Sequence, residues 1–410
     1  MQITSIDTVR LDEFPNLLWV RVHTDDGLTG LGETYFGARA VESYIHESCA
    51  PQLLGRDASQ IERINRDLIP YVGFSGTGVE TRGRSAIDLA LWDLFGKRTQ
   101  QPVYQLLGGA SRERIRTYNT CAGYRYVRSK PDWGTDDWGL DSSDGPYEDL
   151  EAFLHNADEL ALSLLSEGIT GMKIWPFDYA ADASEGYYIS NADLETALEP
   201  FRKIREAVGD QMDIMVELHS LWRFPAALKI AEALEPFKPF FIEDPIRAEN
   251  PGSYDKISRK VNLPIAAGEQ WSSKWGFREA IENEWIDYAR IDLCIAGGLT
   301  ESLKITHLAE THYIDIVPHN PLGPVSAAAC VHLCMASTNV GVQEMPKAPG
   351  SFATDLFPVQ IGFSDGYAFA YDAPGLGVEL NEALAEQHRL SEEDDFLPRM
   401  TRRDGAFTNW

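Results

Sequence analysis

Cysteines are few in this chain, and long hydrophobic runs are absent. Its 410 residues include five cysteines, an odd number, and no two of them form a Cys-x-x-Cys pair. This usage is typical of reduced core cysteines rather than of a disulfide framework. No apolar stretch approaches the roughly 20 residues of a membrane span, and the N-terminus lacks the basic and apolar regions of a signal peptide. We therefore expect a cytoplasmic protein without a membrane segment.

Positive charge is also scarce. Lysine and arginine number 36 against 63 acidic residues, which gives a formal net charge of −27. Because a nucleic-acid backbone requires a basic surface, we expect no nucleic-acid partner. The same charge repels anionic substrates at long range. An acidic substrate would therefore need local positive charge, which a divalent ion and a lysine could supply.

The short motifs of nucleotide-binding enzymes and serine hydrolases are missing as well. There is no Walker lysine and no Gly-x-Ser-x-Gly. We interpret Gly30 and Gly32 as part of a hairpin turn, and Gly108 and Gly109 as part of a loop. Neither pair predicts a dinucleotide site, because neither opens a helix after a strand.

The first 112 residues have the pattern of a small α+β domain. Residues 18–23 and 28–33 flank an Asp-Gly pair, which predicts an antiparallel hairpin. Residues 84–96 are apolar at helical period and end at Gly96, which predicts a helix closed by a glycine.

From about residue 113 strands and helices alternate. The predicted strands are 116–121, 171–175, 213–217, 239–243, 264–268, 287–291, 314–318 and 341–344. From the third strand onward the intervals are about 23 to 27 residues, which suits a repeated strand-plus-helix unit. We therefore predict an α/β fold, with a (β/α)8-type barrel over 113–360 and an α+β capping domain over 1–112. The C-terminal segment, 361–410, should pack back on the capping domain.

The longest interval lies between the first two strands. Its residues 124–147 are rich in glycine, proline, aspartate and aromatic residues. A loop of this length is typically a lid or an assembly contact. We expect a homo-oligomer, since such an insert suits a subunit interface.

Three glutamates follow one another at a constant interval. Glu217, Glu243 and Glu269 are each 26 residues apart (243 − 217 and 269 − 243), and each ends a short apolar run. The C-terminal ends of barrel strands meet at one face, where barrel enzymes carry their chemistry. Three converging carboxylates repel one another unless a hard cation lies between them, and Mg²⁺ prefers oxygen ligands. The pattern predicts a Mg²⁺ site.

Two further strands add side chains at the same end. Lys173 and Trp175 share one face of the second strand, and His219 lies two residues after Glu217 on the third. Lys173 could bind a substrate carboxylate or act as a base. His219 could be a second base, a general acid or a fourth metal ligand.

The last three strands each end in an ionisable residue. Asp292 follows the sixth strand, His319 the seventh and Glu344 the eighth. A carboxylate on one imidazole nitrogen fixes the tautomer and raises basicity, so Asp292 and His319 together predict a general base.

With these residues the chain resembles the mandelate racemase-like subgroup of the enolase superfamily. The resemblance rests on residues 85–97 and 102–109 of the first domain, and on 241–245 and 267–271 of the barrel. It implies that Glu217, Glu243 and Glu269 bind Mg²⁺ and that Asp292 and His319 form the base. It also implies that Glu344 hydrogen-bonds the intermediate. Members of the superfamily are known to use a lysine or histidine base with Mg²⁺ stabilising an ene-diolate.

The chain departs from the subgroup's racemases at two positions. Trp175 stands where those enzymes carry a second lysine base, and the first ligand, often aspartate, is Glu217 followed by His219. Ligand-x-His on this strand resembles the galactonate and gluconate dehydratases, in which that histidine is the general acid. The pattern of Lys173, Pro176 and Phe177 is similar to gluconate dehydratase.

We therefore predict a Mg²⁺-dependent dehydratase of a small-molecule sugar acid, an aldonate. His319 would remove the C2 proton, Glu344 would hydrogen-bond the enediolate, and His219 would protonate the departing C3 hydroxyl, giving a 2-keto-3-deoxy acid. Lys173, with Trp175 beside it, would bind the substrate. The first alternative is a racemase, epimerase or cycloisomerase that uses His219 as its second base, and the second is a non-catalytic sugar-acid binder. Specificity should come from residues 35–37, 71–76 and 124–147.

Overall fold

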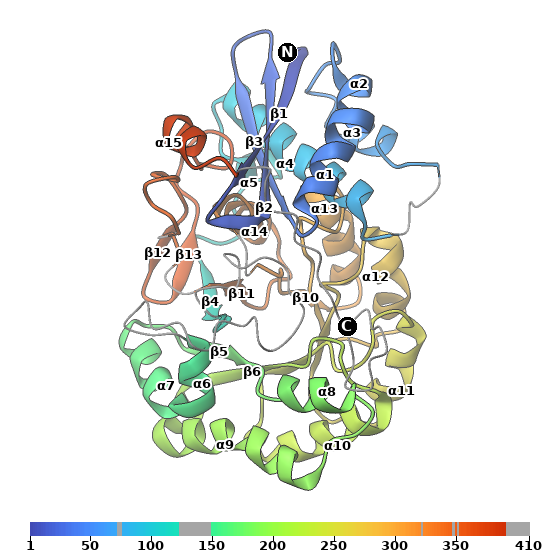
Figure 1. Cartoon of the computed structure of the whole chain (residues 1–410), viewed down its shortest axis with the longest axis vertical. Coiled ribbons are helices and arrows are strands. Elements are labelled where there is room, and N and C mark those ends of the chain that lie inside the picture. Colours follow the sequence, from blue (N-terminus) through green and yellow to red (C-terminus); the bar gives the residue numbers. More distant parts are fainter. Residues whose placement is uncertain (72–75, 123–148, 321–322, 347–348, 351, 391–410) are drawn as a thin grey trace.

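The computed structural model describes the chain except residues 72–75, 123–148, 321–322, 347–348, 351 and 391–410 (Figure 1). The predicted lid or assembly contact at 124–147 therefore lies outside the described residues, as does most of the predicted specificity loop at 71–76.

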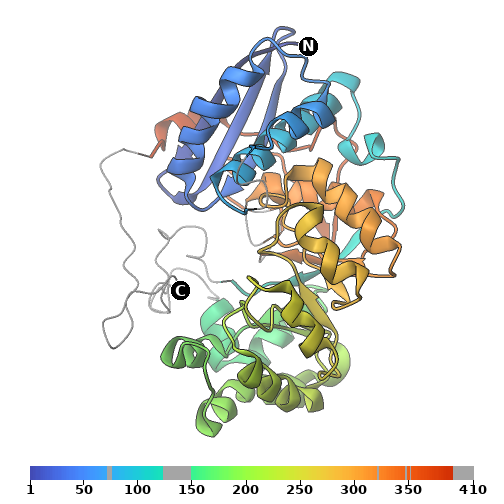
Figure 2. The ribbon, with the colours of Figure 1, turned by 90° about the vertical axis from the view of Figure 1, so that its right-hand side faces the viewer.

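A three-stranded antiparallel sheet and its helices form the upper layer in Figures 1 and 2. The strands are β1 (Ile3–Leu11), β2 (Phe14–Thr24) and β3 (Thr29–Tyr35). The predicted hairpin is confirmed, since β2 pairs with β3 around the turn that contains Gly27. The helices of this layer are α1 (Ala38–Tyr44), η1 (Ile45–Cys49), α2 (Ala50–Leu53), α3 (Ile61–Asp67), α4 (Val79–Thr99) and α5 (Val103–Leu106).

Helix α4 packs directly on β3, and two glycines make this possible. A Cβ atom on Gly30 would lie 2.0 Å from the carbonyl oxygen of Ala90, and one on Gly32 would lie 1.9 Å from that of Ala86. The interpretation of these glycines as turn residues is wrong, because both lie within β3. Their missing side chains allow the helix backbone to approach the strand.

The predicted end of α4 is also wrong. The helix continues past Gly96 to Thr99, and Gln100 caps it in a left-handed conformation with φ 56°. Gly96 is needed for a different reason, since a Cβ atom there would lie 2.5 Å from the Cα atom of Gly375. The glycine makes room for the C-terminal segment rather than ending the helix.

Eight parallel strands form the barrel beneath this layer, and each overlaps its predicted range. They are β4 (Ile115–Asn119), β5 (Gly171–Ile174), β6 (Asp213–Glu217), β7 (Phe241–Glu243), β8 (Ile265–Ala267), β9 (Tyr288–Ala289), β10 (Asp315–Ile316) and β11 (Gln343–Met345). Strands β4 to β10 pair in order, and β11 pairs with β4. An isolated parallel bridge between Ile316 and Val340 joins β10 to the segment before β11.

Helices surround these strands on the outside (Figures 1 and 2). They are α6 (Asp149–His155), α7 (Ala157–Ser166), α8 (Asp178–Ser184), α9 (Asn191–Val208), η3 (Gly209–Gln211), α10 (Phe224–Leu234), η4 (Glu235–Phe237), η5 (Pro251–Ser253), α11 (Tyr254–Ser258), α12 (Ser273–Glu282), α13 (Gly298–Glu310) and α14 (Pro324–Ala336). None of the described helices combines the length and hydrophobicity needed to cross a membrane.

The lumen of the barrel is filled with side chains. Met215 and Phe241 lie two residues before Glu217 and Glu243 on the same strand faces, so they form a layer beneath those carboxylates. The buried cluster comprises Tyr118, Met215, Phe241, Ala266, Val317 and Val342. As in other barrels of this kind, the interior is a packed core, and chemistry is confined to the strand ends.

The described part of the C-terminal segment divides between the two layers. Strands β12 (Gly362–Ser364) and β13 (Tyr367–Phe369) form a hairpin, and β13 pairs antiparallel with β4 of the barrel. Further on, Gly375 exchanges backbone hydrogen bonds with Gln101 and Val103, and Leu390 bonds Arg10 beyond α15 (Glu382–Gln387). The domain boundaries at 112 and 360 stay predictions.

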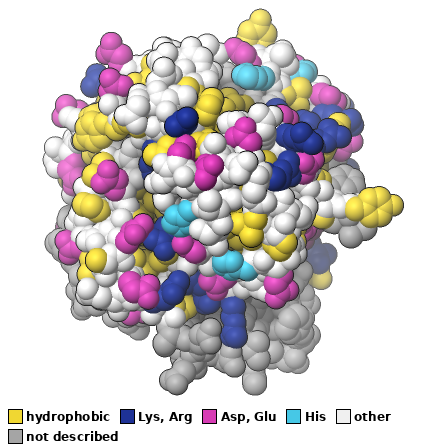
Figure 3. Space-filling view, turned by 90° about the horizontal axis from the view of Figure 1, so that it is seen from above, with side chains coloured by type: hydrophobic (Ala, Val, Ile, Leu, Met, Phe, Trp, Pro, Cys, Tyr) yellow, Lys and Arg dark blue, Asp and Glu magenta, His cyan; other side chains and the backbone are white. Residues whose placement is uncertain are grey.

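Charge is mixed on the face of the molecule that is seen from above. Seen from above, acidic side chains are interspersed with lysine and arginine rather than gathered into one patch (Figure 3).

Candidate active site

The three regularly spaced glutamates converge at the carboxyl ends of neighbouring strands. Glu217 ends β6, Glu243 ends β7, and Glu269 follows β8 by two residues. One carboxylate oxygen from each lies within 4.8 Å of the other two. Glu217 and Glu243 are fully buried. Burial and the neighbouring carboxylates of Glu217, Asp244 and Glu243 raise the pKa of Glu269 well above its usual value.

A buried lysine lies against this cluster. The Nζ atom of Lys173, on β5, donates to Glu217 and Glu243 at 2.9 Å each, and is 2.8 Å from Glu344. Burial alone would lower the pKa of this lysine, but the carboxylates raise it well above its usual value. For Glu217 the two effects have the opposite signs. Burial would raise the pKa of this carboxyl, but Lys173 and His219 lower it to about 2. The ammonium group therefore stays charged beside the carboxylates.

Arg290 is a second buried cation of the site, and it is not among the residues predicted from the sequence. Its guanidinium donates to Glu243, to Glu344 and, at 2.7 Å, to the carbonyl oxygen of Val317, with none of the side chain exposed. A signal was available in the sequence. Arg290 lies two residues before Asp292, the same spacing that relates Glu217 to His219.

His319 and Asp292 form the predicted pair. The Nδ1 atom of His319 is 2.7 Å from Oδ2 of Asp292, and Nε2 is 3.3 Å from Glu269. Asp292 also accepts hydrogen bonds from the hydroxyl of Tyr35 at 2.8 Å and from the backbone N–H of Cys294 at 2.7 Å. Since an ionised carboxylate only accepts, Nδ1 carries the proton and Nε2 is left for another partner.

His219 belongs to a second pair of the same kind. The chain turns sharply after β6, with His219 at φ 48°, and the Nδ1 atom of His219 lies 2.6 Å from Oδ2 of Asp178. The backbone N–H groups of Leu218 and His219 donate to Oε1 of Glu217. Burial would lower the pKa of His219, but Asp178 and Glu217 raise it to about 10.

Asp178 is not among the site residues that the sequence predicts, and no simple rule identifies it. Asp178 begins α8, whereas His219 lies in the loop after β6, so strand periodicity does not connect them. The ring of Trp175 also contacts the imidazole of His219, edge-on and with 5.2 Å between the two centroids. Lys173 therefore reaches the site from β5, Trp175 from the residue just after that strand, and Asp178 from the helix that follows.

Glu344 accepts hydrogen bonds at both of its oxygens. Oε1 accepts from the hydroxyl of Thr120 and is paired with Lys173, while Oε2 accepts from Arg290 and the backbone N–H of Asn320. Burial would raise the pKa of this carboxyl, but Arg290 and Lys173 hold it well below its usual value. The group is therefore an ionised acceptor with four donors.

One cavity collects most of these side chains. Its lining residues are Thr120, Ala122, Lys173, Trp175, His219, Glu269, His319 and Glu344. The three remaining predicted residues, Glu217, Glu243 and Asp292, contact lining residues through the bonds described above. The structure thus brings all nine predicted site residues together.

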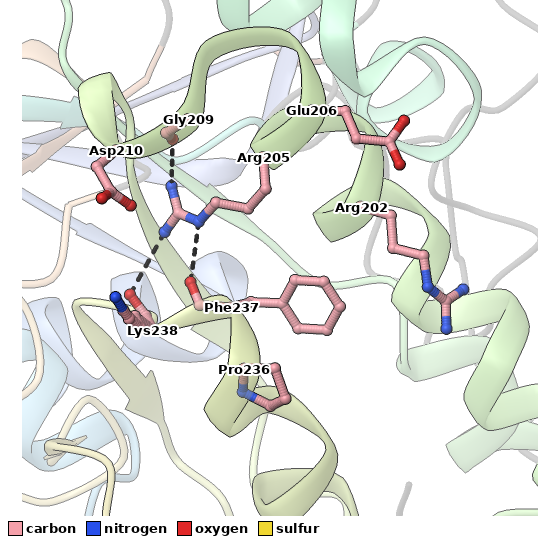
Figure 4. Close-up of a pocket in the computed structure, with 8 residues that line it drawn as sticks. All are labelled: Arg202, Arg205, Glu206, Gly209, Asp210, Pro236, Phe237 and Lys238. Carbon is pink, nitrogen blue, oxygen red and sulfur yellow. Dashed lines mark hydrogen bonds between the residues drawn. The ribbon is translucent and has the colours of Figure 1, made fainter.

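A second cavity, of about 430 Å³, lies at the opposite end of the barrel, where β6 and β7 begin. Arg205 lines it, but its guanidinium donates to the carbonyl oxygens of Gly209, Phe237 and Lys238 (Figure 4) and also to that of Met212. The arginine joins two loops and has little capacity left for a ligand, which agrees with the structural role of this end in barrels.

Known proteins resemble the chain over its whole length. A family model described as enolase C-terminal domain-like matches residues 156–384, and the mandelate racemase/muconate lactonizing enzyme N-terminal domain matches residues 3–108. The chain is 32% identical to D-galactonate dehydratases of Verminephrobacter eiseniae and Ralstonia nicotianae, covering 100% of each chain. A crystal structure of an enolase of the mandelate racemase subgroup from Agrobacterium tumefaciens is 45% identical with a TM-score of 0.84, covering 94% of this chain and 96% of the other.

Proposed function

The chain belongs to the enolase superfamily, in a branch similar to the galactonate dehydratases, and on that premise we propose that it dehydrates an aldonic acid. Its relatedness to D-galactonate dehydratases makes it a dehydratase, a hydro-lyase. The observation that carries the proposal is the pair of aspartate-bound histidines, His319 and His219, which line one cavity together with Lys173. Loss of water requires one group that takes a proton and another that gives one.

Glu217, Glu243 and Glu269 would hold a Mg²⁺ ion. Three carboxylate oxygens within 4.8 Å of one another form a donor set that suits a hard divalent cation, and their mutual repulsion favours one. When bound, Mg²⁺ supplies positive charge that stabilises the negative charge developing on the substrate carboxylate.

His319 would act as the general base at C2. Its Nδ1 atom is bonded to Asp292, so Nε2 accepts the proton when the C2–H bond breaks. The electron pair of that bond moves toward the C1 carboxylate and forms an enediolate. Lys173, whose ammonium group lines the cavity, would neutralise part of this charge.

His219 would act as the general acid at C3. With Asp178 on Nδ1, its Nε2 atom is left to donate a proton to the departing hydroxyl. The C3–O bond breaks, water leaves, and the electron pair of the enediolate forms the C2–C3 double bond of an enol. Tautomerisation of that enol gives the 2-keto-3-deoxy acid.

Glu344 would act mainly through its neighbours. A hydrogen bond from this residue to the enediolate, as the family resemblance implies, requires a proton on the carboxyl. Four donors already surround it, two of them cations. We therefore propose that Glu344 is an ionised anchor that orients Lys173 and Arg290.

The test is to incubate the purified protein with a panel of aldonates and aldarates, with Mg²⁺ or with EDTA, and to assay 2-keto acid. Mg²⁺-dependent formation of a 2-keto acid from an aldonate is the expected result. Absence of turnover across the panel would contradict the proposal. Exchange of deuterium at C2 with the C3 hydroxyl retained would instead favour a racemase or epimerase, with His219 as the second base.

A further inference from the structure

The end of β3 lies across the two barrel loops that carry the general base. The hydroxyl of Thr34 donates to the carbonyl oxygen of Cys294 at 3.2 Å, and that of Tyr35 donates to Asp292 at 2.8 Å. Both residues are buried, and Tyr35 is only 4% exposed. A capping-domain strand therefore touches the loop of Asp292 directly.

The same strand also contacts the start of α14, which follows His319 in the chain. Glu33 accepts from the backbone N–H groups of Gly323 at 2.9 Å and Val325 at 3.2 Å, in the first turn of α14. A carboxylate satisfies free N–H groups at a helix start and is favoured by the helix dipole. A Cβ atom on Gly323 would lie 2.5 Å from the Glu33 carboxylate, so the glycine permits the contact.

Arg82 restrains Tyr35 on its backbone and on its ring. Arg82, on α4, donates to the Tyr35 carbonyl oxygen at 2.8 Å, and its guanidinium lies 4.8 Å from the centroid of the Tyr35 ring. The hydroxyl is thus fixed at the end of a ring that has little freedom to move. It reaches Oδ2 of Asp292, the same oxygen that faces Nδ1 of His319.

We propose that Tyr35 is a positioning residue for the general base. Its hydroxyl holds the Asp292 carboxylate in the orientation that keeps the proton of His319 on Nδ1 and leaves Nε2 for the substrate. The catalytic consequence rests on the proposed function, in which His319 removes the C2 proton. The capping domain then does more than select substrates, because the base is completed by a residue that the barrel does not contain. This differs from the expectation that residues 35–37 serve specificity.

The first test needs no substrate. In protein labelled with ¹⁵N-histidine and supplied with Mg²⁺, the Nδ1-bound proton of His319 is observed by NMR and assigned with His319→Asn. Tyr35→Phe should lose this proton signal or shift it toward a mixture of tautomers, and Asp292→Asn serves as the reference for its loss. Trp92→Phe is the matched control, since it removes a different hydrogen bond between the two layers, the one from Trp92 of α4 to Thr300 of α13 at 2.9 Å. That control should keep the signal, whereas an unchanged signal in Tyr35→Phe would overturn the proposal.

The second test is kinetic. A hydrogen bond to a charged group is worth roughly 10- to 100-fold in rate when it is lost. Tyr35→Phe should therefore lower kcat by about that factor with KM within about twofold, while Trp92→Phe leaves both unchanged. A raised KM with kcat retained would make Tyr35 a specificity residue and overturn the proposal. If the unmodified protein turns over no sugar acid, the proposed function fails, and the NMR result alone decides the role of Tyr35.

Discussion

Two histidine–aspartate pairs face one cavity, and they differ in how each aspartate is held. The Nδ1 atom of His319 lies 2.7 Å from Asp292, and that of His219 lies 2.6 Å from Asp178. Asp292 also accepts from Tyr35 and Cys294, so both of its oxygens are bonded. By contrast, Oδ1 of Asp178 is buried without a hydrogen-bond partner among the described residues.

The two imidazoles also differ in exposure. The side chain of His319 is 7% exposed and lies between Asp292 and Glu269, whereas that of His219 is 30% exposed. The imidazole proposed as the base is therefore the less exposed of the two, and the one proposed as the acid is the more exposed. Equal pairs of residues can therefore serve different tasks, because their surroundings differ.

The largest expected effect is that of His319→Asn. Without a base the C2 proton stays, so we expect both C2–H exchange and dehydration to fall by about 10³- to 10⁴-fold. Exchange is measured by NMR in D₂O, and dehydration by formation of 2-keto acid. Mg²⁺ binding, measured by calorimetry, should be retained because Glu217, Glu243 and Glu269 are unchanged. Persistent exchange at C2 would show that another residue is the base.

The variant His219→Asn should separate the two steps. We expect dehydration to fall by about 10²- to 10³-fold, since the leaving hydroxyl is no longer protonated, while C2–H exchange continues. The same two assays decide the outcome. If the variant also loses C2–H exchange, and the unmodified protein removes the hydroxyl of no substrate, His219 is a second base. The assignment of one acid and one base to the two pairs would then be wrong.

The two aspartates should respond differently to replacement by asparagine. In Asp178→Asn the new side chain can turn its amide N–H₂ toward the side without a partner and keep its oxygen on Nδ1 of His219. In Asp292→Asn the amide N–H₂ meets Cys294 N–H in one orientation, and Tyr35 and His319 in the other. We expect a fall in kcat of roughly tenfold for Asp178→Asn and at least about 100-fold for Asp292→Asn. Equal losses of kcat in the two variants would contradict the view that hydrogen bonds hold Asp292 more firmly than Asp178.

Much of the fold follows from the sequence through two periods. The repeat of strand and helix predicts eight strands, and each observed strand overlaps its prediction. The side-chain period within a strand predicts that Lys173 and Trp175, and likewise Glu217 and His219, face one end. Trp175 and His219 instead lie just after the ends of β5 and β6, and His219 reaches the cavity after a turn at φ 48°. The repeat of strand and helix operates along a single stretch of chain, where local geometry is enough.

The rest of the site depends on contacts between distant segments, which local patterns do not contain. Tyr35 reaches Asp292 from another layer, and Asp178 reaches His219 from a helix. The glycines show the same limit. Glycine is common at helix ends, but Gly96 is required because the backbone of Gly375 approaches it closely. A cap and a close backbone contact favour the same amino acid, so residue type alone does not distinguish them.

The buried His332 shows what the absence of a carboxylate does, and it supports the smallest prediction. His332, on α14, accepts the N–H of Tyr104 at Nδ1, with Nε2 3.2 Å from the carbonyl oxygen of Leu376, and burial lowers its pKa to about 4. The unfolded chain takes up this proton near pH 6.5. Stability from the neutral ring is therefore present above pH 6.5 and lost as the pH falls toward 4, by up to about 3 kcal/mol at 1.36 kcal/mol per unit. Urea unfolding of the wild type and His332→Gln between pH 7 and 4 measures this, and the variant should lose less stability over that range. If the curves of stability against pH for the two proteins are parallel, His332 is protonated in the folded state. A neighbouring carboxylate would then not be the reason why the pKa of His332 differs from that of His219.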